Sequence, residues 1–362
     1  MKDRGAGPAS LQRGMGAAQG IFVAAAVALC LCFLSPELAA GDPPKLLPGE
    51  ELVPMPTLGG TQFWADEFFF HQWHIQRNVL DGHCRLLDGN NLRYAAGDYL
   101  GCRAVLEKIR RNQHFPPMQG KAVVLLHGLG AHGGKMEKLA SFLRQHGGYT
   151  VFKVTYPSTR RDVAGHADAL AHIIAHLDGI DEIHFVAHSL GNIVIRHYLA
   201  DRYDPVTGRQ GDPRIGRFVM LGPPNQGSLV AVALAENQVF ATLTGPAGQQ
   251  LGRQWNALRS HLATPRFEFG VIAGGRGDGR GYNPFLPGDN DGILTVLSTR
   301  LSGARDFLVV PSLHAVLPED SRAMQATLCF LQHGYFISAA ARRPIRDDPI
   351  VGTQSHAMNG AP

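Results

Sequence analysis

The chain has 362 residues, which exceeds the usual length of one domain, roughly 100–200 residues, so one large unit with extensions or two domains would fit. Hydrophobic residues make up 44% and charged residues 18%, so the chain can bury a substantial core, which excludes global disorder and a polytopic membrane protein. The formal net charge is only +4, and no long basic run is present, so nucleic acid is not an expected partner.

The beginning of the chain has the order of a secretory signal. Basic residues precede an apolar run over 21–34, and small residues follow at 39–41. This order predicts that residues 1–40 are a signal peptide and that the protein is secreted or extracytoplasmic, in the cell envelope or periplasm. An N-terminal membrane anchor stays open as an alternative, because Leu38 is a poor residue at position −3 for cleavage after Ala40.

Residues 41–118 are predicted to form a packed N-terminal extension. A Pro-rich linker is followed by aromatic clusters such as residues 68–70, and a helical pattern covers 102–109. Cys84 and Cys102 are the natural pair for a disulfide in an exported protein, although separate buried thiols fit the sequence equally well.

The extension contains four candidate metal ligands. They are His71, His74, His83 and Cys84. No HExxH motif and no paired CxxC motif accompanies them, and aromatic residues surround them. We therefore expect packing here and no metal site.

After Pro117, short β-branched runs alternate with longer amphipathic stretches. This alternation predicts an α/β fold over residues 119–340, with a mostly parallel sheet and helices on both faces. The predicted strands are 121–126, 150–155, 183–186, 217–221, 267–273 and 306–310, and the predicted helices are 137–145, 163–177 and 192–203.

Two further segments complete the predicted domain organisation. The stretch 223–266 is more apolar than a solvated loop, which indicates a small helical cap, or else helices that only complete the core. Residues 341–362 have no apolar periodicity and are rich in Gly, Pro, Asp and Ser, so a disordered tail is expected.

Ser189 lies between a predicted strand and a predicted helix, with small residues two positions before and two positions after it, Ala187 and Gly191. This arrangement is typical of a nucleophile elbow, a tight turn that raises the serine oxygen above the sheet. The loop His127-Gly128-Leu129-Gly130 follows an earlier strand. In an acyl-transfer enzyme, the backbone N–H groups of Leu129 and Leu190 would then form the oxyanion hole.

These motifs resemble those of the α/β-hydrolases, and among them the bacterial lipases and esterases. The resemblance covers about residues 119–336. It rests on His127-Gly128, on Ala187-His188-Ser189-Leu190-Gly191, on the segment 222–228 and on Asn290-Asp291-Gly292. The family orders its catalytic residues serine, acid, histidine along the chain. The resemblance implies that Asp291 is the acid, with Asp289 as the alternative two residues away.

The histidine of such a triad must follow the acid and lie at the carboxyl end of a strand. His314 meets both conditions, since it follows the apolar strand 307–310. His188 is expected to shape the pocket instead, so we assign His127, Gly128 and His188 to substrate binding.

The sequence therefore predicts an exported serine hydrolase that cleaves carboxylic, lipid-like esters through Ser189, His314 and Asp291 and an acyl-enzyme intermediate. An acyltransferase, thioesterase or amidase on the same site is one alternative, and a non-catalytic envelope protein that binds a lipid or a partner is another. No cofactor or metal is expected. For calcium, the only candidate oxygen ligands in the sequence lie near Asp289 and Asp291. The expected partner is a small-molecule or lipid ester, with association to a membrane surface as an option.

Overall fold

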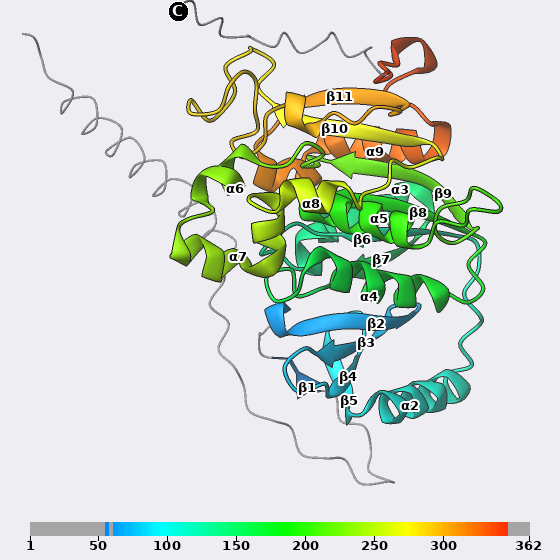
Figure 1. Cartoon of the computed structure of the whole chain (residues 1–362). Coiled ribbons are helices and arrows are strands. Elements are labelled where there is room, and N and C mark those ends of the chain that lie inside the picture. The colour runs from blue at the N-terminus through cyan, green and yellow to red at the C-terminus, as the bar shows by residue number, and fades with distance from the viewer. Residues whose placement is uncertain (1–54, 58–60, 347–362) are drawn as a thin grey trace, which may run out of the picture.

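The computed structural model describes residues 55–57 and 61–346 (Figure 1). The predicted signal peptide and residues 347–362 of the predicted tail lie outside the described residues. Within the described ranges, no helix combines the length and the hydropathy needed to cross a membrane.

The centre of the molecule is a six-stranded parallel sheet with the strand order β11-β10-β9-β8-β6-β7. Its strands are β6 (Lys121–Leu126), β7 (Thr150–Val154), β8 (Glu182–His188), β9 (Ile215–Leu221), β10 (Phe269–Gly275) and β11 (Asp306–Pro311). The inner strands are continuous apolar runs, as β6 illustrates, because helices cover both faces of the sheet. The predicted fold class is confirmed.

Helices α4 (Val163–Ala175) and α5 (Leu190–Asp201) cover one face of this sheet, and α3 (Glu137–Gly147) and α9 (Ser321–His333) cover the other (Figure 1). The apolar side chains form one core on each face. Local signals set the helix ends: the Asp162 side chain accepts the N–H of Gly165 at the start of α4, and Gly148 ends α3 with a φ of 66°.

The N-terminal extension forms a second, antiparallel sheet with the order β1-β5-β4-β3-β2, below the main sheet in Figure 1. Its elements are β1 (Met55–Pro56), η1 (Thr61–Phe63), β2 (Trp64–Phe70), β3 (Trp73–Asn78), β4 (Cys84–Leu87), β5 (Leu92–Gly97) and α2 (Tyr99–Asn112). Strand β2 lies beside β7 and α4. The Asp66 N–H donates to the Thr155 carbonyl oxygen at 2.9 Å, and the rings of Phe69 and Phe152 lie 5.3 Å apart.

Cys84 on β4 and Cys102 on α2 are both buried, and both are free thiols in the structure. Burial raises the pKa of Cys84 to about 11 and that of Cys102 to about 12. Of the two arrangements that the sequence left open, the structure has separate buried thiols.

Three short helices fill the stretch predicted as a cap: α6 (Leu229–Leu234), α7 (Gln238–Leu251) and α8 (Trp255–Arg259). Helix α7 is kinked at Gly245, where φ is 63°, and Pro246 follows. A side chain at Gly245 would collide with the backbone of Thr159, so the glycine lets α7 pack directly on the loop after β7. Leu234 and Leu258 join the main core, so these helices both complete the core and cover the loops at one end of the sheet.

The remaining elements are the short helices η2 (Gly133–Met136), η3 (Leu297–Thr299), η4 (His314–Glu319) and η5 (Ala339–Ala341). After η5, the first residues of the segment predicted as a tail pack against β11. The Arg343 N–H donates to the Asp306 carboxylate at 2.8 Å, and Ile345 is buried and donates its N–H to the Ala304 carbonyl oxygen at 3.0 Å. Residues up to Ile345 of the segment predicted as a tail are therefore packed against the domain.

Candidate active site

The loops that follow all six parallel strands lie at the same edge of the sheet, because the carboxyl ends of parallel strands meet there. The loop after β6 holds Leu129, the turn after β8 holds Ser189, the loop after β10 holds Asp291, and His314 follows β11. The structure thus brings together residues that are far apart in the sequence.

Ser189 occupies a strained turn between β8 and α5. Its φ of 53° and ψ of −123° are unusual for a residue with a side chain, and strain of this kind concentrates at functional sites. The turn is held by the Ser189 N–H, which donates to the Leu221 carbonyl oxygen at 3.0 Å, and by the Asn192 side chain, which donates to the Ser189 carbonyl oxygen at 3.0 Å. Leu190 is the first residue of α5, so its N–H has no acceptor within the helix.

His314 and Asp291 form a buried pair. Nδ1 of His314 lies 2.6 Å from Oδ2 of Asp291, and the exposed fractions of the two residues are 4% and 0%. The other carboxylate oxygen of Asp291 accepts the N–H groups of Ile293 at 3.0 Å and Leu294 at 2.7 Å. The His314 N–H also donates to the Asp291 carbonyl oxygen at 2.9 Å. The carboxylate is therefore fixed, and Nε2 is the ring nitrogen of His314 that stays available.

Asp289, the alternative acid, has a different position. Its two carboxylate oxygens accept the N–H groups of Arg276 at 2.7 Å and Gly277 at 2.8 Å, which closes the base of the loop after β10. Asn290 organises the interior of the same loop, since its side chain bonds to five backbone groups. Asn283 contributes two of them, its N–H and its carbonyl oxygen, and the others belong to Arg280, Gly288 and Gly292. Asp289 thus satisfies backbone groups, whereas Asp291 contacts a histidine.

Both ring nitrogens of His127 are bound within the protein. Nδ1 lies 2.8 Å from the Gly128 carbonyl oxygen, and Nε2 accepts the Tyr156 N–H at 3.3 Å. The ring stacks on Tyr156 with centroids 4.2 Å apart, and the Tyr156 hydroxyl donates to the His127 carbonyl oxygen at 2.6 Å. Burial lowers the pKa of His127 to about 3, so this histidine is neutral. It lines the cavity, but its polar atoms hold the loop.

Gly128 and His188, the other two residues predicted to bind substrate, also line the cavity. A side chain at Gly128 would lie 3.0 Å from Cβ of Ser189 and 3.2 Å from Nδ1 of His188. The glycine therefore allows the loop after β6 to approach the serine closely.

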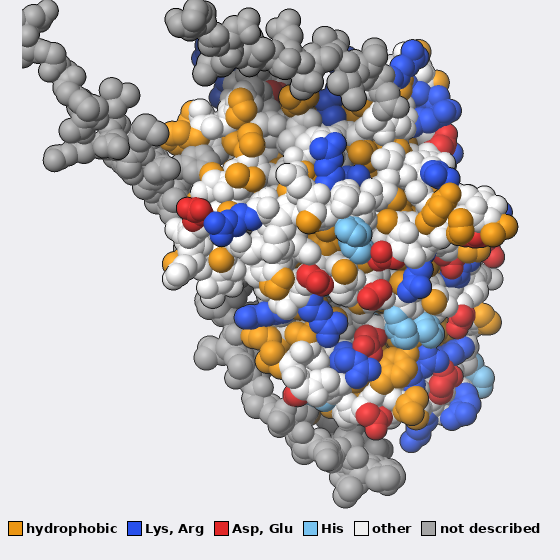
Figure 2. Space-filling view, in the orientation of Figure 1, with side chains coloured by type: hydrophobic (Ala, Val, Ile, Leu, Met, Phe, Trp, Pro, Cys, Tyr) orange, Lys and Arg blue, Asp and Glu red, His pale blue; other side chains and the backbone are white. Residues whose placement is uncertain are grey.

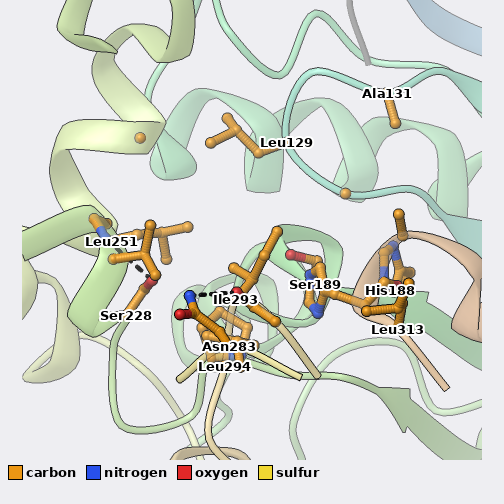
Figure 3. Close-up of a pocket in the computed structure, with 18 of the residues that line it drawn as sticks. Leu129, Ala131, His188, Ser189, Ser228, Leu251, Asn283, Ile293, Leu294 and Leu313 are labelled. Atoms are coloured by element: carbon orange, nitrogen blue, oxygen red, sulfur yellow. Dashed lines mark hydrogen bonds between the residues drawn. The ribbon is translucent and has the colours of Figure 1, made fainter. Parts of the chain in front are cut away.

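Ser189 and His314 line one cavity of about 310 Å³. Its walls are mostly apolar and come from three regions: Leu129 from the loop after β6, Phe240 and Leu251 from the cap, and Ile293 from the loop after β10. Figure 3 shows Leu129, Leu251 and Ile293 pointing into the space beside Ser189. The cap therefore contributes a wall of the cavity.

Sequence reasoning missed the residues that support the loop after β6, above all Tyr156 and Ser158. Ser158 is fully buried, and its hydroxyl accepts the Gly130 N–H at 2.9 Å. Both residues lie about thirty positions further along the chain, so no local pattern could have linked them to the loop.

The described ranges contain no group of three or more His, Cys, Asp or Glu side chains placed to hold a metal ion. Of the histidines considered as ligands, His71 bonds to the Pro116 carbonyl oxygen at 2.9 Å, His74 stacks on Phe69, and His83 pairs with Asp81.

A model of the alpha/beta hydrolase family matches residues 123–359, and the chain belongs to this family. A comparison with curated proteins finds no match. The fold is similar to the mature lipase BlEst2 of Bacillus licheniformis, with 19% identity, 61% of this chain and 94% of that chain covered, and a TM-score of 0.45. It is also similar to the lin2722 gene product of Listeria innocua, with 15% identity, 64% and 99% covered, and a TM-score of 0.43. A lipase-esterase related protein of Clostridium acetobutylicum has 11% identity, 61% and 96% coverage, and a TM-score of 0.37.

Proposed function

We propose that this protein is a serine hydrolase of carboxylic esters, with Ser189 as nucleophile, His314 as general base and Asp291 as the acid that orients the histidine. The observation that carries the proposal is the buried 2.6 Å contact between His314 and Asp291, together with a serine that is held at a φ of 53° and lines the same cavity as His314. A serine hydroxyl needs a histidine to take its proton, and the histidine needs a carboxylate to fix its tautomer.

In the proposed reaction, the Ser189 oxygen attacks the ester carbonyl carbon while His314 takes the hydroxyl proton at Nε2. The carbonyl oxygen becomes an oxyanion, which the N–H groups of Leu129 and Leu190 stabilise. The tetrahedral intermediate collapses, and His314 gives the proton to the departing alkoxide, which leaves as an alcohol. Water, activated by the same histidine, then attacks the acyl-enzyme and releases the carboxylic acid.

The walls of the cavity support an acyl group as the part of the substrate that is bound. Leu129, Phe240, Leu251 and Ile293 present carbon, and each methylene buried there contributes about 0.8 kcal/mol to binding. The apolar surface continues to the mouth, where Phe285 is 51% exposed and Leu313 45% exposed. In Figure 2, hydrophobic side chains gather over the loop after β10, at the upper left, whereas charged side chains are dense over α2 and α4. These features favour a lipid-like ester.

Export remains part of the proposal. It rests on the order of basic, apolar and small residues over 1–40, which lies outside the described residues. Expression of the full chain in a bacterial host, followed by N-terminal sequencing of periplasmic protein, tests it. We expect a new N-terminus near Gly41, and an intact N-terminus on membrane-bound protein would contradict cleavage.

A fluorophosphonate probe tests the activated serine directly, because it forms a covalent adduct with the Ser189 oxygen only when that oxygen is deprotonated during attack. We expect the adduct to map to Ser189 and to be lost in Ser189→Ala and His314→Ala. Ser228→Ala is the matched control, since the Ser228 hydroxyl lines the same cavity but caps α6, accepting the Ala231 N–H at 3.2 Å. Folded wild-type protein that is neither labelled nor active on esters would overturn the proposal.

A further inference from the structure

The loop that carries the Leu129 N–H is a turn held from several sides. The Ala131 N–H donates to the Gly128 carbonyl oxygen at 3.3 Å, and the Gly130 N–H donates to the Ser158 hydroxyl at 2.9 Å. Gly128 and Gly130 flank Leu129, and Gly130 has a φ of 71°. A turn with two glycines has more conformational freedom than most, so its geometry depends on the groups that hold it.

One of those groups comes from the N-terminal extension. Nε2 of Gln62, in η1, donates to the Ala131 carbonyl oxygen at 2.7 Å across 69 residues of sequence. The other end of the same amide, Oε1, accepts the Thr159 hydroxyl at 3.1 Å, the Thr159 N–H at 3.3 Å and the Ser158 hydroxyl at 3.5 Å. A single side chain thus connects the loop after β6 with the loop after β7.

The acceptor is a buried group. Ala131 is 6% exposed and lines the cavity, so its carbonyl oxygen would lose a partner at a largely buried position if Gln62 were removed. Ser158, which holds Gly130, is itself bound by Gln62, so the amide acts on both residues that follow Leu129. Thr159 in turn packs under the kink of α7.

We infer that the N-terminal extension completes the active site. In this inference, Gln62 is a positioning residue for the loop after β6, residues 127–131, which carries the proposed oxyanion donor Leu129 and is called the oxyanion loop below. This inference rests on the proposed function. An oxyanion hole works because its donors are already in place when charge develops, and small displacements of a donor weaken it. The extension is anchored to the end of β7 by Asp66 and Phe69, so Gln62 can hold the loop against a fixed base.

Two substitutions separate the halves of the amide. Gln62→Ala removes both, whereas Gln62→Glu keeps an acceptor for Thr159 and Ser158 but removes the donor to Ala131. We expect kcat on an ester to fall about 10-fold in both variants, with KM changed less than about 2-fold. This loss of kcat is smaller than the loss caused by removing an oxyanion donor itself. It is larger than the effect of losing one ordinary supporting hydrogen bond. The affinity for a boronic acid, which mimics the tetrahedral intermediate, should fall by the same factor as kcat/KM.

Asp88→Ala is the matched control. Asp88 belongs to the same extension and is buried, but its carboxylate accepts the N–H groups of Asn90 at 2.9 Å and Leu92 at 2.8 Å in the turn between β4 and β5. We expect this variant to melt at a lower temperature and to keep its kcat. Wild-type kcat in both Gln62 variants, or an equal loss in Asp88→Ala, would overturn the inference and leave the proposed function intact.

A second readout does not depend on turnover. Amide hydrogen exchange of a peptide that covers residues 127–132 should become faster in Gln62→Ala and stay unchanged in Asp88→Ala, because Gln62 holds that turn. Unchanged exchange in Gln62→Ala overturns the inference. A wild-type protein with neither ester turnover nor probe labelling overturns the proposed function and this inference together.

Discussion

His188 bonds to the main chain of His314: its Nε2 lies 2.9 Å from the His314 carbonyl oxygen, and the two rings lie 4.7 Å apart. Because a carbonyl oxygen only accepts, Nε2 of His188 carries the proton. Burial, together with the neighbouring His314, holds the pKa of His188 well below its usual value, so the ring is neutral. The residue before Ser189 is thereby fixed to the segment that carries the proposed base, 126 positions further along the chain.

The two acids of the loop after β10 should respond differently to the same substitution. Asp291→Asn is expected to lower kcat about 10⁴-fold, because an amide next to Nδ1 of His314 no longer favours the tautomer that the reaction needs. Asp289→Asn should lower kcat less than about 10-fold, since Asp289 only accepts backbone N–H groups. Steady-state kinetics on one soluble ester measures both values. The reverse order would identify Asp289 as the acid.

Two adjacent residues of α6 test the acyl cavity. Ala231 is 7% exposed and lines the cavity, whereas Val232 is 54% exposed. In Ala231→Phe, the added ring should occupy acyl space, so kcat/KM should fall about 4-fold for every methylene that no longer fits. A series of p-nitrophenyl esters of increasing chain length measures this. The optimum should move to shorter chains in Ala231→Phe and stay in place in Val232→Phe; equal profiles would place the acyl group elsewhere.

Gly191 allows the turn at Ser189 and the loop after β6 to pack together. A Cβ there would lie 2.8 Å from both the His127 carbonyl oxygen and Cβ of Leu126. Gly191→Ala should therefore destabilise the fold by about 1–3 kcal/mol and lower kcat, because the oxyanion loop has to shift. Gly101→Ala is the control, since Gly101 also lies in the first turn of a helix, and its Cβ would come no closer than 3.2 Å to any neighbouring atom, the Asp98 carboxylate oxygen. Urea unfolding and kinetics of both variants check this, and a stable, fully active Gly191→Ala would contradict it.

Buried histidines should make the fold sensitive to acid. Burial lowers the pKa of His166 to about 4. Below about pH 6.5, the usual pKa of histidine, the unfolded chain binds a proton at this residue that the folded chain does not bind. The free energy of unfolding is therefore not reduced by this residue above about pH 6.5. It falls as the pH drops toward 4, by about 1.4 kcal/mol per pH unit for each such proton.

The variant His166→Phe isolates this effect, because Nε2 of His166 is buried without a hydrogen-bond partner. Urea titrations at pH 7.0, 5.5 and 4.5 measure the unfolding free energy. Its fall with decreasing pH should be shallower in His166→Phe, by up to about 1.4 kcal/mol per pH unit. The exposed His146 provides the control variant, His146→Gln, which should keep the wild-type slope. A slope that His166→Phe leaves unchanged would mean that other groups cause the acid sensitivity.

The main sheet could be predicted because each strand carries its own signal. The run 121–126 is apolar from its second residue on, and the structure has a strand with these same bounds. Ser189 and His314 could be proposed from the sequence because a turn after a strand can be recognised locally and because the family fixes the order of such residues. What the structure adds at this site is the 2.6 Å contact between His314 and Asp291, which no sequence pattern measures.

The strands of the extension could not be predicted, for a physical reason. Strand β2 is buried over nearly its whole length, including Phe68, Phe69 and Phe70, so it lacks the alternation that indicates a half-exposed strand. A register shift between Asp66 and Phe68 disrupts the pattern further. The role of Gln62 was also hidden, because its partners lie 69 to 97 residues away.

Strand β7 is the last strand of the main sheet, and a bare outer strand offers unpaired backbone groups to any other chain. Here β2 lies next to it, with the Asp66 N–H and carboxylate both bound to Thr155 and with Phe69 against Phe152. The extension thus covers part of an outer strand of the kind through which copies of a protein pair. A fragment that begins at residue 119 would lose that cover, so self-association and low solubility are the expected behaviour of an isolated hydrolase domain.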